Sequence, residues 1–160
     1  MITCEFEDHG RAKLRHVTVG VLVVKDNQIL LGLRGTYHGR PILESGKWGP
    51  LGGYMERDEN LAGTARREVM EESGWEIANL KLLRINDNPN RPAEDRQNVD
   101  MIFMAEAVRQ VGTGDEEVAE LKWFDLDNLP PREQIAFDHA DNFELYKKYR
   151  QERFDLPVIG

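Results

Sequence analysis

The chain has 160 residues, enough to bury a core without disulfides, and we expect one domain spanning residues 1–160. Its net charge of -8 argues against a nucleic-acid polymer as partner, because phosphate backbones favour basic surfaces. A single cysteine, no signal peptide and no apolar run near the roughly 18 residues that span a bilayer predict a cytoplasmic protein without a membrane partner.

The N-terminal half combines a strand hairpin with a helix. Residues 17–24 are apolar and β-branched on both faces, which predicts a buried strand, and a polar turn leads to a returning strand over 29–33. Residues 34–53 contain too many Gly and Pro residues for regular structure and predict a loop. A helix over about 60–73 should end at Gly74, a residue suited to the left-handed position after a helix.

The C-terminal half predicts further strands and a second helix. Strand patterns cover 80–85, 99–105 and 121–124, and a long polar connection occupies 86–98. An amphipathic helix is expected over roughly 138–152. This order of elements predicts an α/β (α+β) fold, an α/β/α sandwich with one mixed β-sheet between helices.

Three glutamates share one side of the first helix. At 100° per residue, Glu68, Glu71 and Glu72 fall within an arc of roughly 100° beside the apolar stripe. Like charges four residues apart cost an isolated helix about 0.2–0.5 kcal/mol, and a place at the core boundary adds desolvation. A divalent cation removes this repulsion, and Mg²⁺ favours carboxylate oxygens. A solvated acidic face is the alternative interpretation.

The spacing of the residues around these glutamates distinguishes the two interpretations. Eight positions between residues 53 and 74 carry the pattern, and they are Gly53, Glu59, Arg67, Glu68, Val69, Glu71, Glu72 and Gly74. Over residues 53–75 the arrangement resembles the Nudix box of the Nudix hydrolase family. Trp75 departs from the aliphatic residue that usually closes the box, and Pro50 does not directly precede the paired glycines.

The resemblance implies a metal site on this helix. Glu68, Glu71 and Glu72 would be the carboxylate ligands, with the backbone carbonyl of Gly52 as a further ligand. The implied cofactor is Mg²⁺, with Mn²⁺ as the alternative.

The resemblance also implies that Arg67 supports catalysis. Arg67 would pair with Glu59 or Glu68 and so orient the metal-binding carboxylates. An arginine in a weak exposed ion pair is the alternative.

A carboxylate near the metal-bound water would act as general base. Glu68 is the candidate inside the box. In the loop over 112–120, the resemblance implies Glu117, because the family's extra metal-binding or catalytic glutamate lies about six residues before the aromatic residue of the closing strand, here Trp123, and it would act as base or as an additional metal ligand. Gly112 and Gly114 predict hinge freedom for this loop.

Three arginines are predicted to bind substrate. Arg34 ends the returning strand where the family often has a basic residue near the phosphates. Arg91 and Arg96, in the 86–98 connection, would bind a distal phosphate or ribose, with plain solvated loop residues as the alternative.

The family resemblance implies hydrolysis of a phosphoanhydride in a small nucleotide. We expect a nucleoside diphosphate linked to another group, of the ADP-ribose or nucleotide-sugar type, because the 86–98 connection offers room for a second moiety. A (d)NTP pyrophosphohydrolase of the pool-cleaning type is the alternative. A non-catalytic ligand-sensing module is the alternative from another class, although the intact box argues against it. Many family members dimerise, which leaves a homodimer open.

Overall fold

A mixed β-sheet forms the centre of the molecule, described here by a computed structural model for residues 2–91 and 97–160. Among these residues, seven strands build the sheet: β3 (Val17–Lys25), β4 (Gln28–Arg34), β7 (Trp48–Gly49), β8 (Trp75–Asn86), β9 (Val99–Gln110), β10 (Val118–Asp125) and β11 (Val158–Ile159). The order is β10-β4-β3-β9-β8-β11, with β7 paired to β4. The β3–β9 pair is parallel and the β3–β4, β4–β10 and β8–β9 pairs are antiparallel, so the predicted mixed sheet is confirmed.

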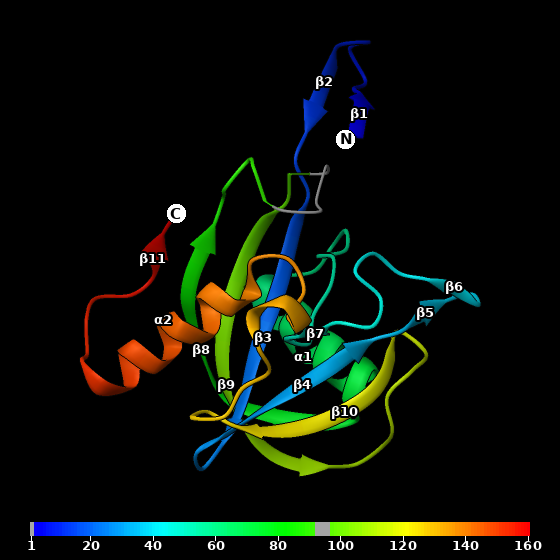
Figure 1. Ribbon diagram of the computed structural model, residues 1–160. Coiled ribbons are helices and arrows are strands. Elements are labelled where there is room, and N and C mark those ends of the chain that lie inside the picture. Colours follow the sequence, from blue (N-terminus) through cyan, green and yellow to red (C-terminus); the bar gives the residue numbers. More distant parts are fainter. Residues whose placement is uncertain (1, 92–96) are drawn as a thin grey trace.

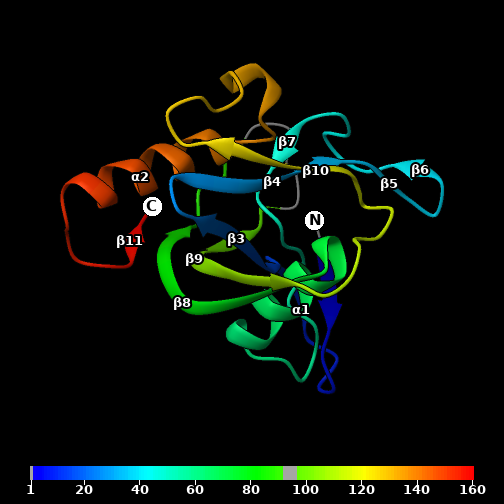
Figure 2. The same ribbon diagram turned by 90° about the horizontal axis from the view of Figure 1, so that it is seen from below.

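Helices cover both faces of the sheet (Figures 1 and 2). The helical elements are α1 (Leu61–Ser73), the 3-10 turn η1 (Arg132–Gln134) and α2 (His139–Gln151). Successive β3 residues point to opposite faces, so Val21 packs in one core layer with Val69 of α1. Leu22 packs in the other layer with Phe143 of α2. The α/β/α sandwich expected from the sequence is therefore the observed architecture.

Both ends of α1 are fixed by the residues that the sequence indicates. The Asn60 side chain accepts a hydrogen bond from the Gly63 N–H at 2.9 Å, which caps the first turn. Gly74 adopts φ 68 and donates its N–H to Met70 O at 2.8 Å. A side chain at Gly74 would collide with the Gly112 backbone, so this position requires glycine for conformation and for space. The helix that carries the glutamates thus starts and stops at defined points.

Several elements are longer than predicted or absent from the prediction. Strands β8, β9 and β10 extend beyond 80–85, 99–105 and 121–124, because pairing to neighbouring strands continues past these ranges. Irregular structure was expected throughout 34–53, but three short strands lie there: β5 (Thr36–Tyr37), β6 (Arg40–Pro41) and β7.

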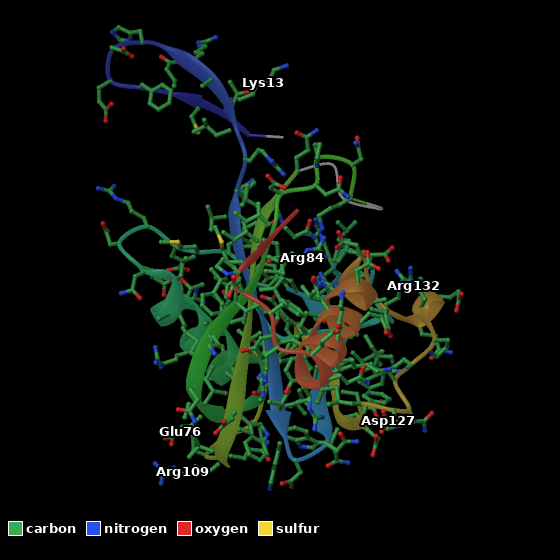
Figure 3. The ribbon with its side chains drawn as sticks, turned by 90° about the vertical axis from the view of Figure 1, so that its left-hand side faces the viewer. Lys13, Glu76, Arg84, Arg109, Asp127 and Arg132 are labelled. Carbon is green, nitrogen blue, oxygen red and sulfur yellow. The ribbon has the colours of Figure 1, made fainter. Side chains whose placement is uncertain are left out.

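An N-terminal hairpin also goes beyond the predicted elements. Strands β1 (Ile2–Glu5) and β2 (Arg11–Leu14) pair with each other and project beyond the sheet. Figure 3 shows Lys13 on this arm, at the end of the molecule opposite Glu76 and Arg109.

Among the described residues, none of the helices has the length and apolar character needed to cross a bilayer.

Candidate active site

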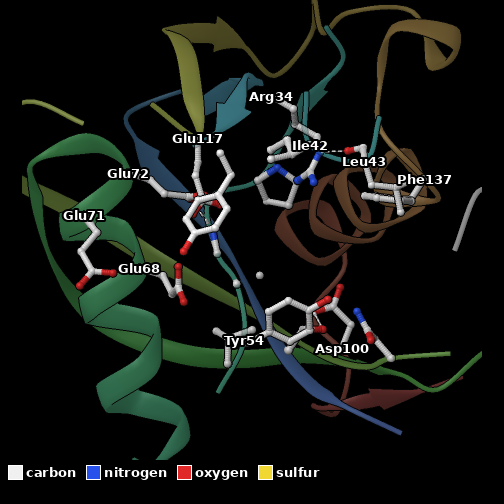
Figure 4. A pocket seen from close by; sticks show the side chains of 18 of the residues that line it. Arg34, Ile42, Leu43, Tyr54, Glu68, Glu71, Glu72, Asp100, Glu117 and Phe137 are labelled. Atoms are coloured by element: carbon white, nitrogen blue, oxygen red, sulfur yellow. Dashed lines mark hydrogen bonds between the residues drawn. The ribbon is translucent and has the colours of Figure 1, made fainter. Parts of the chain in front are cut away.

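A cavity of about 750 Å³ lies beside α1, between the loop that precedes this helix and the ends of β4 and β9. Figure 4 shows acidic side chains of α1 on one wall and Arg34 and Phe137 on the other. Every predicted site residue within the described part of the chain lines the cavity: Arg34, Gly52, Arg67, Glu68, Glu71, Glu72, Arg91 and Glu117. Arg96 lies outside the described residues.

Glu72 is the most buried of the α1 glutamates, with 9% of its surface exposed. Its Oε2 accepts a hydrogen bond from the Gly52 N–H at 2.7 Å. Burial raises the pKa of Glu72 well above the ordinary glutamate value, and the Gly52 N–H only partly opposes this effect. Gly52 has φ 146, and a Cβ there would collide with Val19 O. The paired glycines therefore let the loop backbone approach both β3 and the carboxylate.

Glu68 lies one helical turn before Glu72 and faces the same cavity (Figure 4). Burial raises its pKa from the ordinary 4.5 to about 7, and the charges of Glu71 and Glu117 act in the same direction. A Cβ on Gly53 would lie 2.6 Å from Glu68 Oε1, so this glycine leaves room for the carboxylate. The second paired glycine of the box thus has a specific steric role.

Arg67 connects the carboxylates around it. Its Nε and Nη2 donate to Glu59 at 2.7 and 3.0 Å, and its Nη1 lies 2.9 Å from both Glu68 and Glu71. Nη2 also donates to Tyr54 O at 3.1 Å. The sequence left Glu59 or Glu68 as the partner of Arg67, and the structure pairs it with both. The Arg67 side chain is only 25% exposed, so its ion pairs are less screened by water than those of an arginine on the open surface.

Replacing Arg67 by Ala should destabilise the protein most in mildly acidic to neutral solution. Hydrogen bonds from Arg67 lower the pKa of Glu59 from the ordinary 4.5 to about 2. A carboxyl group with a lowered folded-state pKa stabilises the fold above pH 4.5, and this contribution is lost as the pH falls towards 2. Arg67→Ala should lower the free energy of unfolding at pH 7 and reduce its dependence on pH in that window.

Denaturant unfolding between pH 2 and pH 7 measures this effect. Arg66→Ala is the matched control, because the neighbouring arginine is exposed and donates only to Ala62 O among the hydrogen bonds described for it. Equal pH profiles for the two variants would show that Arg67 does not hold Glu59 as inferred.

Glu117 enters the cavity from the loop before β10, beside Glu72 (Figure 4). Partial burial raises its pKa, and the neighbouring Asp115 adds to this effect. Its charge in turn contributes to the raised pKa values of Glu68 and Glu72. The loop carboxylate selected from the sequence thus shares one electrostatic environment with the α1 glutamates.

The loop carrying Glu117 is tied to the end of α1. The Asp115 N–H donates to Glu71 O at 3.1 Å, and the Gly112 N–H donates to Gly74 O at 3.3 Å. A Cβ on Gly114 would collide with the Glu72 carbonyl oxygen. Gly114 thus permits close packing of the loop against α1, and the hinge freedom expected of Gly112 and Gly114 stays a prediction.

Arg34 lies on the cavity wall opposite the glutamates (Figure 4). Its Nε donates to Leu43 O at 2.7 Å, and its guanidinium carbon lies 5.2 Å from the centre of the Phe137 ring. Phe137 has φ 52, an unusual conformation for a large side chain. Arg34 thus organises this wall and also places a cation in the cavity.

Arg91 was predicted to bind substrate, with a solvated loop position as the alternative, and the structure shows that it is buried. Its side chain is 3% exposed and lies 2.8 Å from Asp138 and 3.5 Å from Asp100. Its guanidinium carbon also lies 5.6 Å from the Phe137 ring centre. Arg91 therefore lines the cavity as a buried cation already paired with two carboxylates.

Polar residues that the sequence analysis did not assign form the floor of the cavity. Asp100 is 3% exposed, and burial raises its pKa, while Thr18 donates a hydrogen bond to it at 3.0 Å. His139 is buried, and desolvation lowers its pKa from 6.5 to about 3, so the ring is neutral at physiological pH. An aspartate in an alternating strand pattern indicates a solvent-facing position, and only its tertiary contacts with Thr18 and Arg91 reveal that Asp100 is buried.

The comparison with protein-family models decides the classification of this site. The NUDIX domain model matches residues 14–147, which includes the whole glutamate helix and the loop of Glu117. The chain belongs to the Nudix hydrolase family.

Relatives within the Nudix family have different named substrates. An ADP-ribose pyrophosphatase from Methanocaldococcus jannaschii is 28% identical over 134 residues, covering 84% of this chain and 74% of the relative. An oxidized purine nucleoside triphosphate hydrolase from Danio rerio is 30% identical over 124 residues, covering 74% and 71%. The crystal structure of a UDP-X diphosphatase matches with a TM-score of 0.76 at 20% identity, covering 96% of this chain and 71% of that one. The last similarity confirms the Nudix fold.

The carboxylates of this Nudix site suit a divalent cation chemically. Glu68, Glu72 and Glu117 offer hard oxygen donors, and the charge of Glu117 adds to burial in raising the pKa values of Glu68 and Glu72. Within residues 2–91 and 97–160, however, no three carboxylate, imidazole or thiol side chains converge closely enough to hold a metal ion. Arg67 meanwhile engages Glu68 and Glu71. The carboxylates are the type of donor that a divalent cation prefers. For several of them to bind one cation together, their side chains would have to turn towards a common point.

Proposed function

We propose that this chain is a Mg²⁺- or Mn²⁺-dependent pyrophosphohydrolase acting on a nucleoside diphosphate linked to a second group, such as ADP-ribose or a nucleotide sugar. The observation that carries the proposal is the cavity itself, which combines the box glutamates and Glu117 on one wall with Arg34 on the other. Its volume of about 750 Å³ falls within the range of sites that enclose small ligands. The acidic wall suits a divalent cation, and the basic wall opposite suits the diphosphate bound to that cation.

The proposed metal ligands are Glu68, Glu71, Glu72, Glu117 and the Gly52 carbonyl. A divalent cation bound there would polarise a phosphoryl oxygen and acidify a water molecule. Arg67 holds the carboxylates in position through its contacts with Glu59, Glu68 and Glu71.

Glu117 is the proposed general base, and Glu68 is the alternative. Both carboxylates line the cavity, Glu68 from α1 and Glu117 from the loop before β10. A carboxylate beside a metal-bound water is the kind of group that removes a proton from it. Arg34 would contact the substrate phosphates from the opposite wall.

Two substrate classes remain candidates because relatives carry two kinds of names. The ADP-ribose pyrophosphatase of M. jannaschii supports a substrate with two moieties, and so does the cavity size. The oxidized purine nucleoside triphosphate hydrolase of D. rerio supports the alternative, a (d)NTP pyrophosphohydrolase. We favour the first class, since the cavity lining extends beyond the glutamates and Arg34 to the buried polar residues Asp100 and His139.

ADP-ribose or a nucleotide sugar should show a kcat/KM about tenfold higher than any nucleoside triphosphate, with a nucleoside monophosphate among the products. A panel of NTPs, oxidised dGTP, ADP-ribose, NADH and nucleotide sugars, analysed for product identity, measures this preference. An NTP preferred by about tenfold, with pyrophosphate released, would replace the proposal by its alternative. Binding without turnover of any compound would indicate a ligand-sensing module.

A further inference from the structure

The β5–β6 hairpin borders the cavity and depends on outside contacts for its position. Strands Thr36–Tyr37 and Arg40–Pro41 pair with each other, and among the described residues they join no larger sheet. The hairpin extends away from the end of β4 (Figure 1). A two-stranded hairpin of this size is not stable by itself in water, so other contacts must hold it in place.

The Glu116 side chain supplies such contacts. Its Oε1 accepts a hydrogen bond from the His38 N–H at 2.8 Å, and its Oε2 lies 3.4 Å from the Gly39 N and 3.3 Å from the Thr36 hydroxyl. The turn residues His38 and Gly39 have φ 49 and φ 71, so both N–H groups point towards one carboxylate. One side chain thus binds the turn and the first strand of the hairpin together.

Backbone hydrogen bonds join the same segment to the base of the hairpin. The Thr36 N–H donates to Glu116 O at 3.0 Å, and the Gly35 N–H donates to Glu117 O at 2.8 Å. A Cβ on Gly35 would lie 2.6 Å from Glu116 O, so this junction is too close for another residue. The hairpin and the Glu117 segment therefore form one hydrogen-bonded unit.

Glu116 and Glu117 are adjacent in this segment, and their side chains point to different places. Glu117 lines the cavity, while Glu116 reaches the hairpin. The hairpin contributes Tyr37 and Arg40 to the cavity lining. A guanidinium suits a phosphate or a carboxylate, and a phenol ring suits the face of a sugar or base.

We propose that Glu116 is a positioning residue that holds the 36–41 hairpin against the cavity, where Tyr37 and Arg40 contact the substrate moiety beyond the cleaved bond. This inference rests on the proposed function for the identity of the substrate. It gives a specific role to a carboxylate that the sequence analysis did not select.

Two measurements on Glu116→Ala test the inference. Amide hydrogen exchange at His38 and Gly39 should accelerate about tenfold or more, because their acceptor is lost. With ADP-ribose, KM should rise about tenfold while kcat stays within about threefold, because a contact made equally in ground and transition states is weakened. Glu116→Gln keeps an acceptor oxygen and should fall between wild type and Glu116→Ala in both readouts.

Two further variants distinguish the specific role of the hairpin from effects that any nearby substitution could have. Glu120→Gln is the matched control, since this nearby carboxylate is exposed on β10 and should leave exchange and KM unchanged. Arg40→Ala should raise KM for ADP-ribose without changing exchange at His38 and Gly39.

Each alternative outcome contradicts a defined part of the inference. Unchanged exchange in Glu116→Ala would show that Glu116 does not hold the hairpin. Faster exchange with an unchanged KM would show that the hairpin does not contact the substrate. A wild type that hydrolyses no pyrophosphate would overturn the proposed function and the substrate contact with it, and exchange would still decide the positioning role.

Discussion

Glu72→Gln should reduce kcat by on the order of 10² to 10³-fold or more while the protein remains folded. Glu72 is the most buried box carboxylate, and the Gly52 N–H fixes its orientation. The amide of Gln can accept the same hydrogen bond but lacks the charge needed to organise a metal-bound diphosphate. The loss should therefore appear in turnover and leave the fold in place.

Metal-free stability provides the internal control for this variant. Because burial raises the pKa of Glu72, the ionised side chain opposes folding, and stability decreases as the pH rises above the ordinary glutamate value towards the raised one. Glu72→Gln removes this effect, so in EDTA at pH 8 it should be as stable as wild type or slightly more stable. More than about a tenth of the wild-type rate at saturating Mg²⁺ would refute the assignment.

Glu117→Gln should lower kcat on the order of 10²-fold or more with little change in KM, since a base or additional ligand acts mainly in the transition state. The side chain lies in the cavity beside Glu72 and influences its pKa. Steady-state kinetics at saturating substrate measures the effect. Glu120→Gln, on the exposed side of β10, should stay within a few-fold of wild type.

Substitutions at Glu116, Glu117 and Glu120 distinguish a general base, a positioning residue and a residue without a role in catalysis. If kcat collapses in Glu120→Gln or Glu116→Gln instead of Glu117→Gln, the register that selects Glu117 is wrong. If kcat collapses in none of them, Glu68 becomes the better candidate for the base.

The sequence predicts the glutamate wall of the site because that wall is local. Glu68 and Glu72 lie one turn apart on one helix, and Asn60 and Gly74 mark the ends of that helix. Helical periodicity therefore places the carboxylates side by side without knowledge of the rest of the fold. The pairing of Arg67 with Glu59, eight residues earlier, also follows the box spacing.

Other parts of the site depend on contacts between distant segments. Arg91 appears in the sequence as a loop arginine, and only folding brings it next to Asp138 of the segment before α2. Glu116 contacts a hairpin almost 80 positions earlier in the chain, at His38, with no pattern in either segment to indicate it. Asp100 lies in a strand whose alternating pattern indicates exposure, but tertiary packing buries it. Periodicity cannot anticipate such pairs, because it describes neighbours along one element.

Hydrolysis of ADP-ribose in ¹⁸O-labelled water, with Mg²⁺ or with EDTA, tests the central claim most directly. The account predicts AMP and ribose phosphate, a single ¹⁸O in one of the two products, and no turnover in EDTA until Mg²⁺ or Mn²⁺ is restored. Release of free adenine or ribose, turnover that persists in EDTA, or failure to cleave this and every other pyrophosphate of the panel would contradict it.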